Sequence, residues 1–247
     1  MIDRRLNYGR HNIAAFLRKA APFRNIVDLG AGSGTDLDMA ADICPSAARF
    51  GLETYPPNVE ILKRRHEVIS LDLEKDPFPF EDESIDVVMS NQVLEHVKEI
   101  FWILHQVSRV IRVGGYMIIG VPNLASFHNR LLLLFGMQPT SIQNHSAHVR
   151  GYTKHDIMRM LQMIFPDGYE LEDFKGSNFY PLPPAAAKPM AKLLPNSAWG
   201  IFFLLKKKKA YHDEFLMHPV LAELETNYYV ADARERLAKK AMAKVSE

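Results

Sequence analysis

The sequence predicts an α/β fold in which a mostly parallel sheet of seven strands is flanked by helices and carries an inserted or C-terminal cap. Two observations lead to this class. Over the first two-thirds of the 247 residues, short apolar runs alternate with amphipathic stretches, as in βαβ units. A glycine-rich turn, residues 30–34, also follows the first apolar run directly. The length fits one large domain with an elaborated cap.

The bulk composition is that of a globular protein without a strong charge bias. Hydrophobic residues make up 47% of the chain, charged residues 24%, and the formal net charge is +1. Such a small charge gives no general attraction to nucleic acid, so no nucleic-acid partner is expected. The single cysteine, Cys44, cannot form an internal disulfide. The N-terminus is polar and the apolar runs are too short to span a bilayer, so we expect a cytoplasmic protein.

The first two-thirds of the chain predicts five strands with helices between most of them. Apolar runs predict strands over residues 25–29, 48–52, 68–71, 85–90 and 116–121. Helical patterns cover residues 10–21, 34–43, 56–66 and 98–112. Pro56 and Pro57 suit the first turn of the third helix. Residues 76–84 are rich in proline and acidic side chains and predict a loop, and Gly114–Gly115 predict a turn.

After Pro122 the pattern loosens, and this part is expected to form the cap. It predicts helices over residues 125–135 and 153–164 and strands over 169–174 and 199–205. Residues 136–151 are polar and irregular, and residues 181–195, with five prolines, are expected to be a connector or lid. The tail from His212 is charged and predicted to be helical. We expect its end, from about residue 231, to pack on the domain or on a second copy in a homodimer.

The most informative segment is the turn after the first strand, Asp28-Leu29-Gly30-Ala31-Gly32-Ser33-Gly34. Glycine adopts positive φ and lets a ligand approach the backbone, and the next helix offers free N–H groups. The third glycine comes one residue earlier than in the dinucleotide-binding fingerprint. Asp28 suits a cationic amino group better than a pyrophosphate. The turn therefore indicates an amino-acid-bearing nucleoside, and a NAD- or nucleotide-dependent enzyme is the alternative.

This turn resembles motif I of the class I S-adenosylmethionine-dependent methyltransferases, which have a Rossmann-like fold. Residues 24–123 follow the family's motif order closely, and residues 124–205 follow it loosely. The resemblance implies that S-adenosyl-L-methionine is the cofactor. It implies that Glu53 binds the ribose hydroxyls, because a carboxylate accepts two O–H donors well. The expected cofactor-binding residues are Asp28, Gly30, Ala31, Gly32, Gly34, Glu53, Thr54, Asp72, Leu73, Asn91 and Gln92.

Three histidines are the candidates for catalysis. Methyl transfer to an oxygen requires removal of a proton, and histidine is the natural base near neutral pH. His96 follows the fourth strand, near the expected position of the methyl group, with local packing as an equal alternative. His145 and His148 lie in the expected acceptor-binding insert, with a polar surface loop as the alternative. Their spacing also suits a metal pair, but no third ligand is evident, so no metal is expected.

The resemblance also divides the chain into functional parts. We expect a methyltransferase domain over residues 1–205, with the cofactor half at about 24–123 and an acceptor-binding insert at about 124–195. Residues 206–247 are expected to form a basic strand end and a helical tail. The run Asn91-Gln92-Val93-Leu94 lacks the Asn/Asp-Pro-Pro-aromatic motif of methyltransferases that act on the exocyclic amines of DNA bases.

The layout instead resembles the family branch that acts on small molecules, glycans or lipids. We therefore predict an enzyme that O-methylates a small molecule, a sugar or a lipid-linked glycan. A cofactor-binding subunit without turnover is the non-enzymatic alternative. The run Lys206–Lys209 is expected to be a solvated strand end. Its functional alternative, together with Phe202 and Phe203, is contact with anionic lipid headgroups at the inner face of the membrane.

Overall fold

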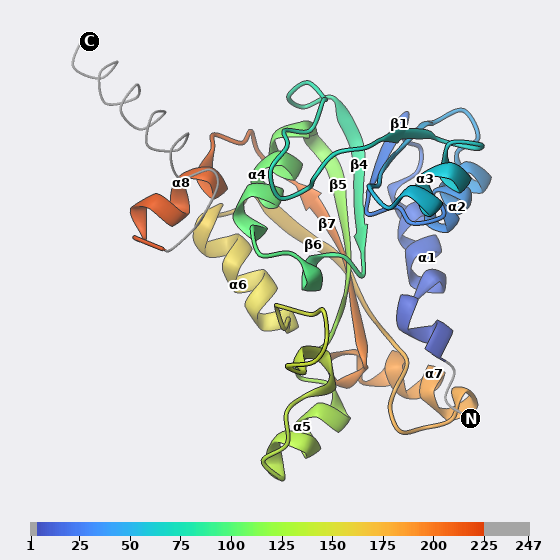
Figure 1. The fold of residues 1–247 in the computed structure, drawn as a ribbon, viewed down its shortest axis with the longest axis vertical. Coiled ribbons are helices and arrows are strands. Elements are labelled where there is room, and N and C mark those ends of the chain that lie inside the picture. The colour runs from blue at the N-terminus through green and yellow to red at the C-terminus, as the bar shows by residue number, and fades with distance from the viewer. Residues whose placement is uncertain (1–3, 225–247) are drawn as a thin grey trace.

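The computed structural model describes residues 4–224 and contains one twisted sheet with helices on both faces (Figure 1). The strands are β1 (Asn25–Leu29), β2 (Ala48–Leu52), β3 (Glu67–Ile69), β4 (Ile85–Asn91), β5 (Ile111–Pro122), β6 (Tyr169–Ser177) and β7 (Gly200–Lys207). The α-helices are α1 (Arg10–Ala20), α2 (Thr35–Ile43), α3 (Pro56–Leu62), α4 (Ile100–Val110), α5 (Phe127–Leu134), α6 (Lys154–Ile164), α7 (Pro184–Leu193) and α8 (Glu214–Leu221). Short 3₁₀ helices are η1 (Arg4–Tyr8), η2 (Leu94–His96), η3 (Thr140–Ile142) and η4 (Pro195–Ser197).

The sheet has seven strands in the order β3-β2-β1-β4-β5-β7-β6. The pairs among β1 to β5 are parallel, and β7 runs antiparallel to both β5 and β6. The predicted fold, a mostly parallel seven-stranded sheet flanked by helices, is therefore confirmed.

The core lies in two layers because side chains alternate between the faces of each strand. On β4, Val88 packs in the layer of α4, α6 and α8, whereas Val87 and Met89 pack in the layer of α1, α2 and α3. These strand residues are at most 1% exposed. Burial on both faces explains why the three consecutive residues Val87–Met89 of this central strand are all apolar.

Two predicted elements differ from the structure. The pair Gly114–Gly115 is not a separate turn, because β5 already begins at Ile111 and the glycines form an irregularity in its pairing with β4. The expected connector over residues 181–195 contains helix α7. Pro184 occupies the first helical turn, where no N–H is needed, whereas Pro189 lies inside α7 and removes one hydrogen-bond donor there. The buried methyl groups of Ala187 and Ala191 then let α7 pack closely on β6.

One residue of the lysine run, Lys207, differs from the solvated strand end that was expected, whereas Lys208 and Lys209 are exposed. Strand β7 continues to Lys207, which pairs with Tyr169 in β6 and is 0% exposed. Its Nζ donates to the carbonyl oxygens of Ser108 (2.8 Å) and Ile111 (2.7 Å) and lies 3.2 Å from a Glu83 carboxylate oxygen. These acceptors replace water around the buried ammonium.

The aromatic residues before the run do not support membrane contact at this place. Phe202 and Phe203 are 0% exposed and belong to the two core layers. None of the helices within residues 4–224 has the length and apolar character that crossing a bilayer requires. The predicted packing of the tail from about residue 231 lies outside the described residues.

The buried ammonium predicts a specific stability effect. Lys207→Met keeps most of the side-chain volume but leaves two buried carbonyl groups unpaired, so it should lower the free energy of unfolding by about 2–3 kcal/mol. Chemical denaturation monitored by circular dichroism measures this change. The matched control is Lys208→Met, because Lys208 is exposed and pairs with Glu170 at the surface. Equal destabilisation by both variants would contradict the assigned role of Lys207.

Candidate functional site

The candidate site lies where the strand order of the sheet reverses. From β1 the chain proceeds outward through β2 and β3, and then returns to place β4 on the other side of β1. The loops after β1 and β4 therefore leave in opposite directions and open a crevice at the carboxyl ends of these strands. A cavity of about 440 Å³ lies there, and a second of about 390 Å³ lies toward the ends of β2 and β3. Gly30 lines both.

The turn from β1 to α2 needs its glycines for conformational reasons. Gly30, Gly32 and Gly34 have φ values of 62°, 55° and 87°, in the left-handed region that disfavours other residues. A Cβ on Gly30 would lie 2.8 Å from the Val93 side chain, whereas a Cβ on Gly32 would project into open space. Gly32 lines the larger cavity, so its bare backbone is available to a ligand.

The larger cavity has an acidic floor. Asp28 at the end of β1 and Asp36 in the first turn of α2 are 3% and 7% exposed, and both line it. The pKa of Asp28 is raised well above its usual range. Burial is the largest cause, and the nearby negative charges of Asp36 and Glu53 add to it. Arg10 offsets part of this charge through a 2.9 Å ion pair with Asp36. Buried carboxylates in such a cavity favour a cationic ligand.

Asp36 was missed by the sequence analysis. Its position two residues after Gly34, in the first turn and on the buried side of α2, was the local signal. The side-chain amide of Asn91 also donates to it, at 2.7 Å.

The second cavity is organised around Glu53, which follows β2. Its carboxylate accepts hydrogen bonds from the backbone N–H groups of Gly32 (2.8 Å) and Thr54 (2.9 Å), and so ties the glycine turn to the end of β2. Thr54, Asp72 and Leu73 line the same cavity. The Asp72 carboxylate accepts from the Glu74 backbone N–H, which lowers its pKa.

Two polar side chains at the end of β4 face the larger cavity. Asn91 donates through Nδ2 to the Tyr8 carbonyl at 3.1 Å, and Gln92 adopts a φ of 60°. Within residues 4–224, the buried Oδ1 of Asn91 and Nε2 of Gln92 have no hydrogen-bond partner. An unpaired buried polar atom beside a cavity indicates a place where a ligand would bind. All expected cofactor-binding residues except Gly34 line one of the two cavities, and Gly34 caps α2.

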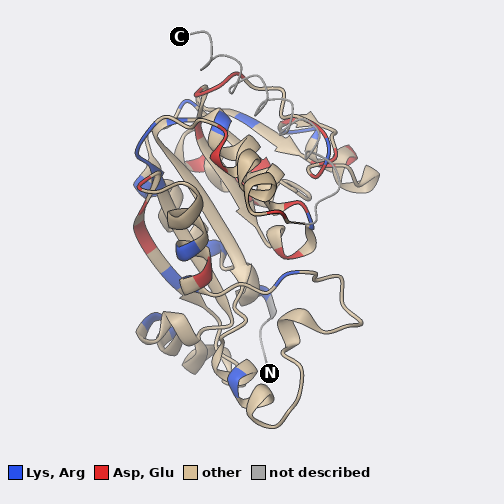
Figure 2. Ribbon diagram, turned by 90° about the vertical axis from the view of Figure 1, so that its left-hand side faces the viewer, with Lys and Arg blue, Asp and Glu red and all other residues tan. Residues whose placement is uncertain are grey.

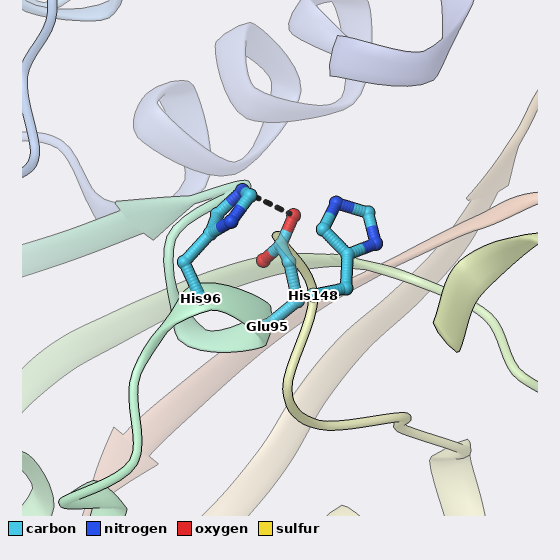
Figure 3. Close-up of side chains that lie close together, drawn as sticks. All are labelled: Glu95, His96 and His148. Carbon is cyan, nitrogen blue, oxygen red and sulfur yellow. Dashed lines mark ion pairs between the residues drawn. The ribbon is translucent and has the colours of Figure 1, made fainter. Parts of the chain in front are cut away.

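Glu95, His96 and His148 form a cluster on the wall of the larger cavity (Figure 3). Their ligand atoms lie within 4.8 Å of one another, and the two imidazole centroids are 4.7 Å apart. Glu95 is 2% exposed, and burial raises its pKa to about 7. Both histidines were predicted as catalytic candidates from the sequence, but Glu95, which directly precedes His96, was not.

Both histidines bond to backbone carbonyl groups through Nδ1. His96 Nδ1 lies 3.3 Å from the Ala147 oxygen, and His148 Nδ1 lies 2.8 Å from the Ser141 oxygen. A carbonyl oxygen only accepts, so each Nδ1 carries the proton and each neutral ring has its lone pair on Nε2. Burial lowers the pKa of His96, which favours this neutral form.

The cluster depends on contacts between two segments that are distant in the sequence. The backbone N–H groups of Val149 and Arg150 both donate to the Glu95 carbonyl, at 2.8 and 3.2 Å. The buried hydroxyl of Tyr152 donates to the Leu94 carbonyl at 3.0 Å. These bonds fix the segment that carries His148 against η2. His145 is exposed, is not part of the cluster and does not line either of the two cavities. The structure therefore brings together His96 and His148, two of the three predicted histidines.

Comparisons with known proteins identify the domain type of the part of the chain that runs from β1 through most of β5. Residues 27–119 match the family model described as a methyltransferase domain. A probable S-adenosylmethionine-dependent methyltransferase of Mycobacterium tuberculosis is 30% identical over 105 residues, which cover 42% of this chain and 38% of that protein. A phthiotriol/phenolphthiotriol dimycocerosates methyltransferase of Mycobacterium ulcerans is 28% identical over 98 residues, 38% of this chain and 36% of that protein. The chain thus aligns with less than half of the length of these curated relatives.

The fold is also found among solved structures. A methyltransferase from Archaeoglobus fulgidus superposes with a TM-score of 0.56 at 14% identity, and the alignment covers 80% of this chain and 94% of that one. At this identity, the likeness concerns the fold alone.

The glycine turn yields a binding prediction. Gly32→Val places a β-branched side chain at positive φ and in the open space of the cavity. It should abolish binding of S-adenosylhomocysteine, the demethylated form of the cofactor that the sequence resemblance implies, measured by isothermal titration calorimetry. Gly136→Val is the matched control, because Gly136 also has positive φ and open surroundings but lies outside the cavity. Retained binding in the Gly32 variant would exclude this turn from the cofactor site.

Proposed function

The chain carries a domain of the class I S-adenosylmethionine-dependent methyltransferase family, and from this premise we propose that it O-methylates a small molecule, a sugar or a lipid-linked glycan. S-adenosyl-L-methionine is the methyl donor of this family. One observation carries the proposal: an acidic cavity at the strand-order reversal has the proton-accepting side chains of Glu95, His96 and His148 on its wall.

In this proposal the cofactor spans the two cavities. Its methionine part lies in the larger cavity, where Asp28 and Asp36 provide negative charge for the ammonium and sulfonium groups. Its adenosine part lies in the smaller cavity, beside Glu53. Residues 24–123 then form the cofactor half and residues 124–195 the acceptor-binding part.

The proposed reaction is a direct substitution. The acceptor oxygen attacks the methyl carbon as the carbon–sulfur bond breaks, a carbon–oxygen bond forms, and the sulfonium becomes a neutral thioether. The protein aligns the two reactants and removes the hydroxyl proton. The unprotonated Nε2 atoms of His96 and His148 and the carboxylate of Glu95 are suited to accept this proton. An amine acceptor would need no such group, so the cluster favours oxygen.

The acceptor class is supported by two further observations. The chain lacks the motif after β4 that is typical of methyltransferases acting on exocyclic amines of DNA bases. One relative is a phthiotriol/phenolphthiotriol dimycocerosates methyltransferase, and its name gives phthiotriol and phenolphthiotriol dimycocerosates as the acceptors of that protein. The proposal therefore includes lipid-linked acceptors beside small hydroxylated molecules.

The first experiment is titration of the purified protein with S-adenosylhomocysteine, followed by transfer of a labelled methyl group to hydroxylated lipids, glycans and phenols. Binding with transfer to a hydroxyl supports the proposal. Binding without transfer to any acceptor favours a cofactor-binding subunit that lacks turnover. Binding of NAD instead of S-adenosylhomocysteine would contradict the proposed cofactor.

Glu53 provides a second prediction. Glu53→Ala removes a charged acceptor for the ribose hydroxyls and also frees the Gly32 N–H. It should weaken S-adenosylhomocysteine binding by about 2–3 kcal/mol. Calorimetry measures the affinity, and Glu60→Ala on the exposed side of α3 is the control. An unchanged affinity in the Glu53 variant would mean that the ribose is held elsewhere.

A further inference from the structure

The cluster of Glu95, His96 and His148 has the composition of a metal site with open coordination positions. Two imidazole nitrogens and one carboxylate oxygen are the ligands that Zn²⁺ and related divalent transition metals prefer. A metal-bound set needs donors about 3–4 Å apart, since each lies about 2.1 Å from the ion. The ligand atoms here lie within 4.8 Å of one another, and Glu95 Oε1 is 4.0 Å from His96 Nε2. Small side-chain rotations would therefore bring them onto one ion.

The two histidines are already oriented for coordination. Metal-binding histidines usually donate their other ring N–H to a carbonyl or carboxylate, which fixes the ring and its tautomer. His96 and His148 do so through Nδ1 to the carbonyls of Ala147 and Ser141. Each Nε2 lone pair is then free for a metal.

Glu95 supplies an independent observation. The residue is 2% exposed, and within residues 4–224 its Oε2 has no hydrogen-bond partner. A buried carboxylate oxygen without a partner is costly and needs an explanation. A bound cation would provide both a partner and a compensating charge.

From these observations we propose that Glu95, His96 and His148 bind a divalent transition-metal ion of the zinc class on the wall of the cofactor cavity. Three protein ligands leave at least one coordination position for a water molecule or substrate, as in catalytic rather than structural sites. The sequence analysis paired His145 with His148 and found no third ligand. The structure instead groups His148 with two residues of η2.

The role of the ion rests on the proposed function, whereas its binding does not. An acceptor hydroxyl coordinated at the open position would lose its proton more easily, because a bound metal ion lowers the pKa of oxygen ligands. With the ion bound, its three ligands would no longer accept the hydroxyl proton as they do in the metal-free site. The proton would pass to water instead, and the resulting oxyanion would attack the methyl carbon. Binding by itself requires only the three side chains.

The test is titration of the untagged full-length protein with Zn²⁺, and with Co²⁺ monitored by its visible absorption. We expect one ion per chain, with affinity lowered at least roughly tenfold by His148→Ala and by Glu95→Gln. His145→Ala is the matched control, because this exposed histidine lies three residues from His148 and outside the cluster. Equal Zn²⁺ affinity in wild type and both cluster variants, or an equal loss in the His145 variant, would overturn the site.

The same variants separate the metal site from the cofactor site. Glu95→Gln and His148→Ala should lose Zn²⁺ affinity but keep the wild-type circular dichroism spectrum and midpoint of thermal unfolding, which shows that they fold. Gly32→Val should lose S-adenosylhomocysteine binding but keep Zn²⁺. Zn²⁺ binding without S-adenosylhomocysteine binding in wild type would contradict the proposed function and leave the metal site intact.

A different part of the molecule carries a second inference. Helix α5 and the C-terminal end of α7 lie at one end of the molecule and expose large apolar side chains there (Figure 1). Leu134 and Phe135 are 76% and 75% exposed, and Leu193 at the end of α7 is 72% exposed. Apolar side chains that gather on projecting helices indicate an interaction surface.

The charge of this end identifies its partner. Residues 121–155 and 174–212 contain no Asp or Glu, although the whole chain has 29 of these residues. Arg130, Lys188 and Lys192 are exposed on α5 and α7, and among the described residues Figure 2 shows basic but no acidic ones at this end. Apolar side chains beside basic ones suit the surface of an anionic membrane. We therefore infer that the α5–α7 end docks on anionic lipid, with its apolar side chains inserted among the headgroups.

Vesicle sedimentation tests this surface. We expect binding to vesicles of phosphatidylcholine with phosphatidylglycerol, little binding to phosphatidylcholine alone, and weaker binding at high salt. Leu134→Glu combined with Phe135→Glu should abolish it, and Lys188→Ala should reduce it roughly fivefold. The control Leu221→Glu changes an equally exposed leucine on α8, at the opposite end of the molecule (Figure 1). If the wild-type protein does not bind the anionic vesicles, the surface would instead be one that contacts a protein, and the inference would be overturned. An equal loss of vesicle binding in the Leu221→Glu control would also overturn it.

Discussion

The reversal of strand order between β1 and β4 is the constraint on which the rest of the site depends. Parallel strands bring their carboxyl ends to one edge of the sheet, and the reversal makes the two central loops diverge there. The opening that results needs no dedicated residues, because it is a consequence of chain direction. What the sequence adds is a backbone without side chains at Gly32 and acidic groups at Asp28 and Asp36. The topology provides a cavity, and these acidic residues make it favour a cationic ligand.

The site concentrates buried acidic groups whose oxygens are not all satisfied by the protein. Asp28 and Asp36 lie close together, and Glu95 has an oxygen without a protein partner among the described residues. Lys207 is a useful contrast, because its buried ammonium has three acceptors. Satisfied buried charge contributes to a unique structure, whereas unsatisfied charge at a cavity indicates binding. Lys207 and Glu95 are both buried, and they differ in whether hydrogen-bond partners from the protein satisfy their charged groups.

The segment from Ala147 to Tyr152 is joined to η2 by both main-chain and side-chain hydrogen bonds. The N–H groups of Val149 and Arg150 donate to the Glu95 carbonyl, while the Tyr152 hydroxyl donates to the Leu94 carbonyl and His96 Nδ1 bonds to the Ala147 carbonyl. Together these bonds hold His148 next to Glu95. The proposed metal ion and the proposed acceptor would both be placed by this junction. The α5–α7 end continues from the same insert, which connects the proposed lipid surface to the acceptor side of the cavity.

Much of the fold could be predicted from the sequence because its signals are local. The apolar runs of β1 and β4 and the glycine turn at residues 30–34 each act within a few residues, and the predicted strands and the site near Asp28 and Glu53 follow from them. Helix α7 was not predicted from the sequence, because its segment is rich in proline and the effect of a proline on a helix depends on its position within the helix. The sequence predicts a solvated Lys207, because a run of lysines does not reveal where the strand ends. The grouping of Glu95 with His148, and the exclusion of His145, depended on packing between distant segments. Local chemistry therefore determined the fold class and the candidate cofactor residues, whereas only the tertiary structure decided the cluster, because contacts between remote segments leave no periodic pattern in the sequence.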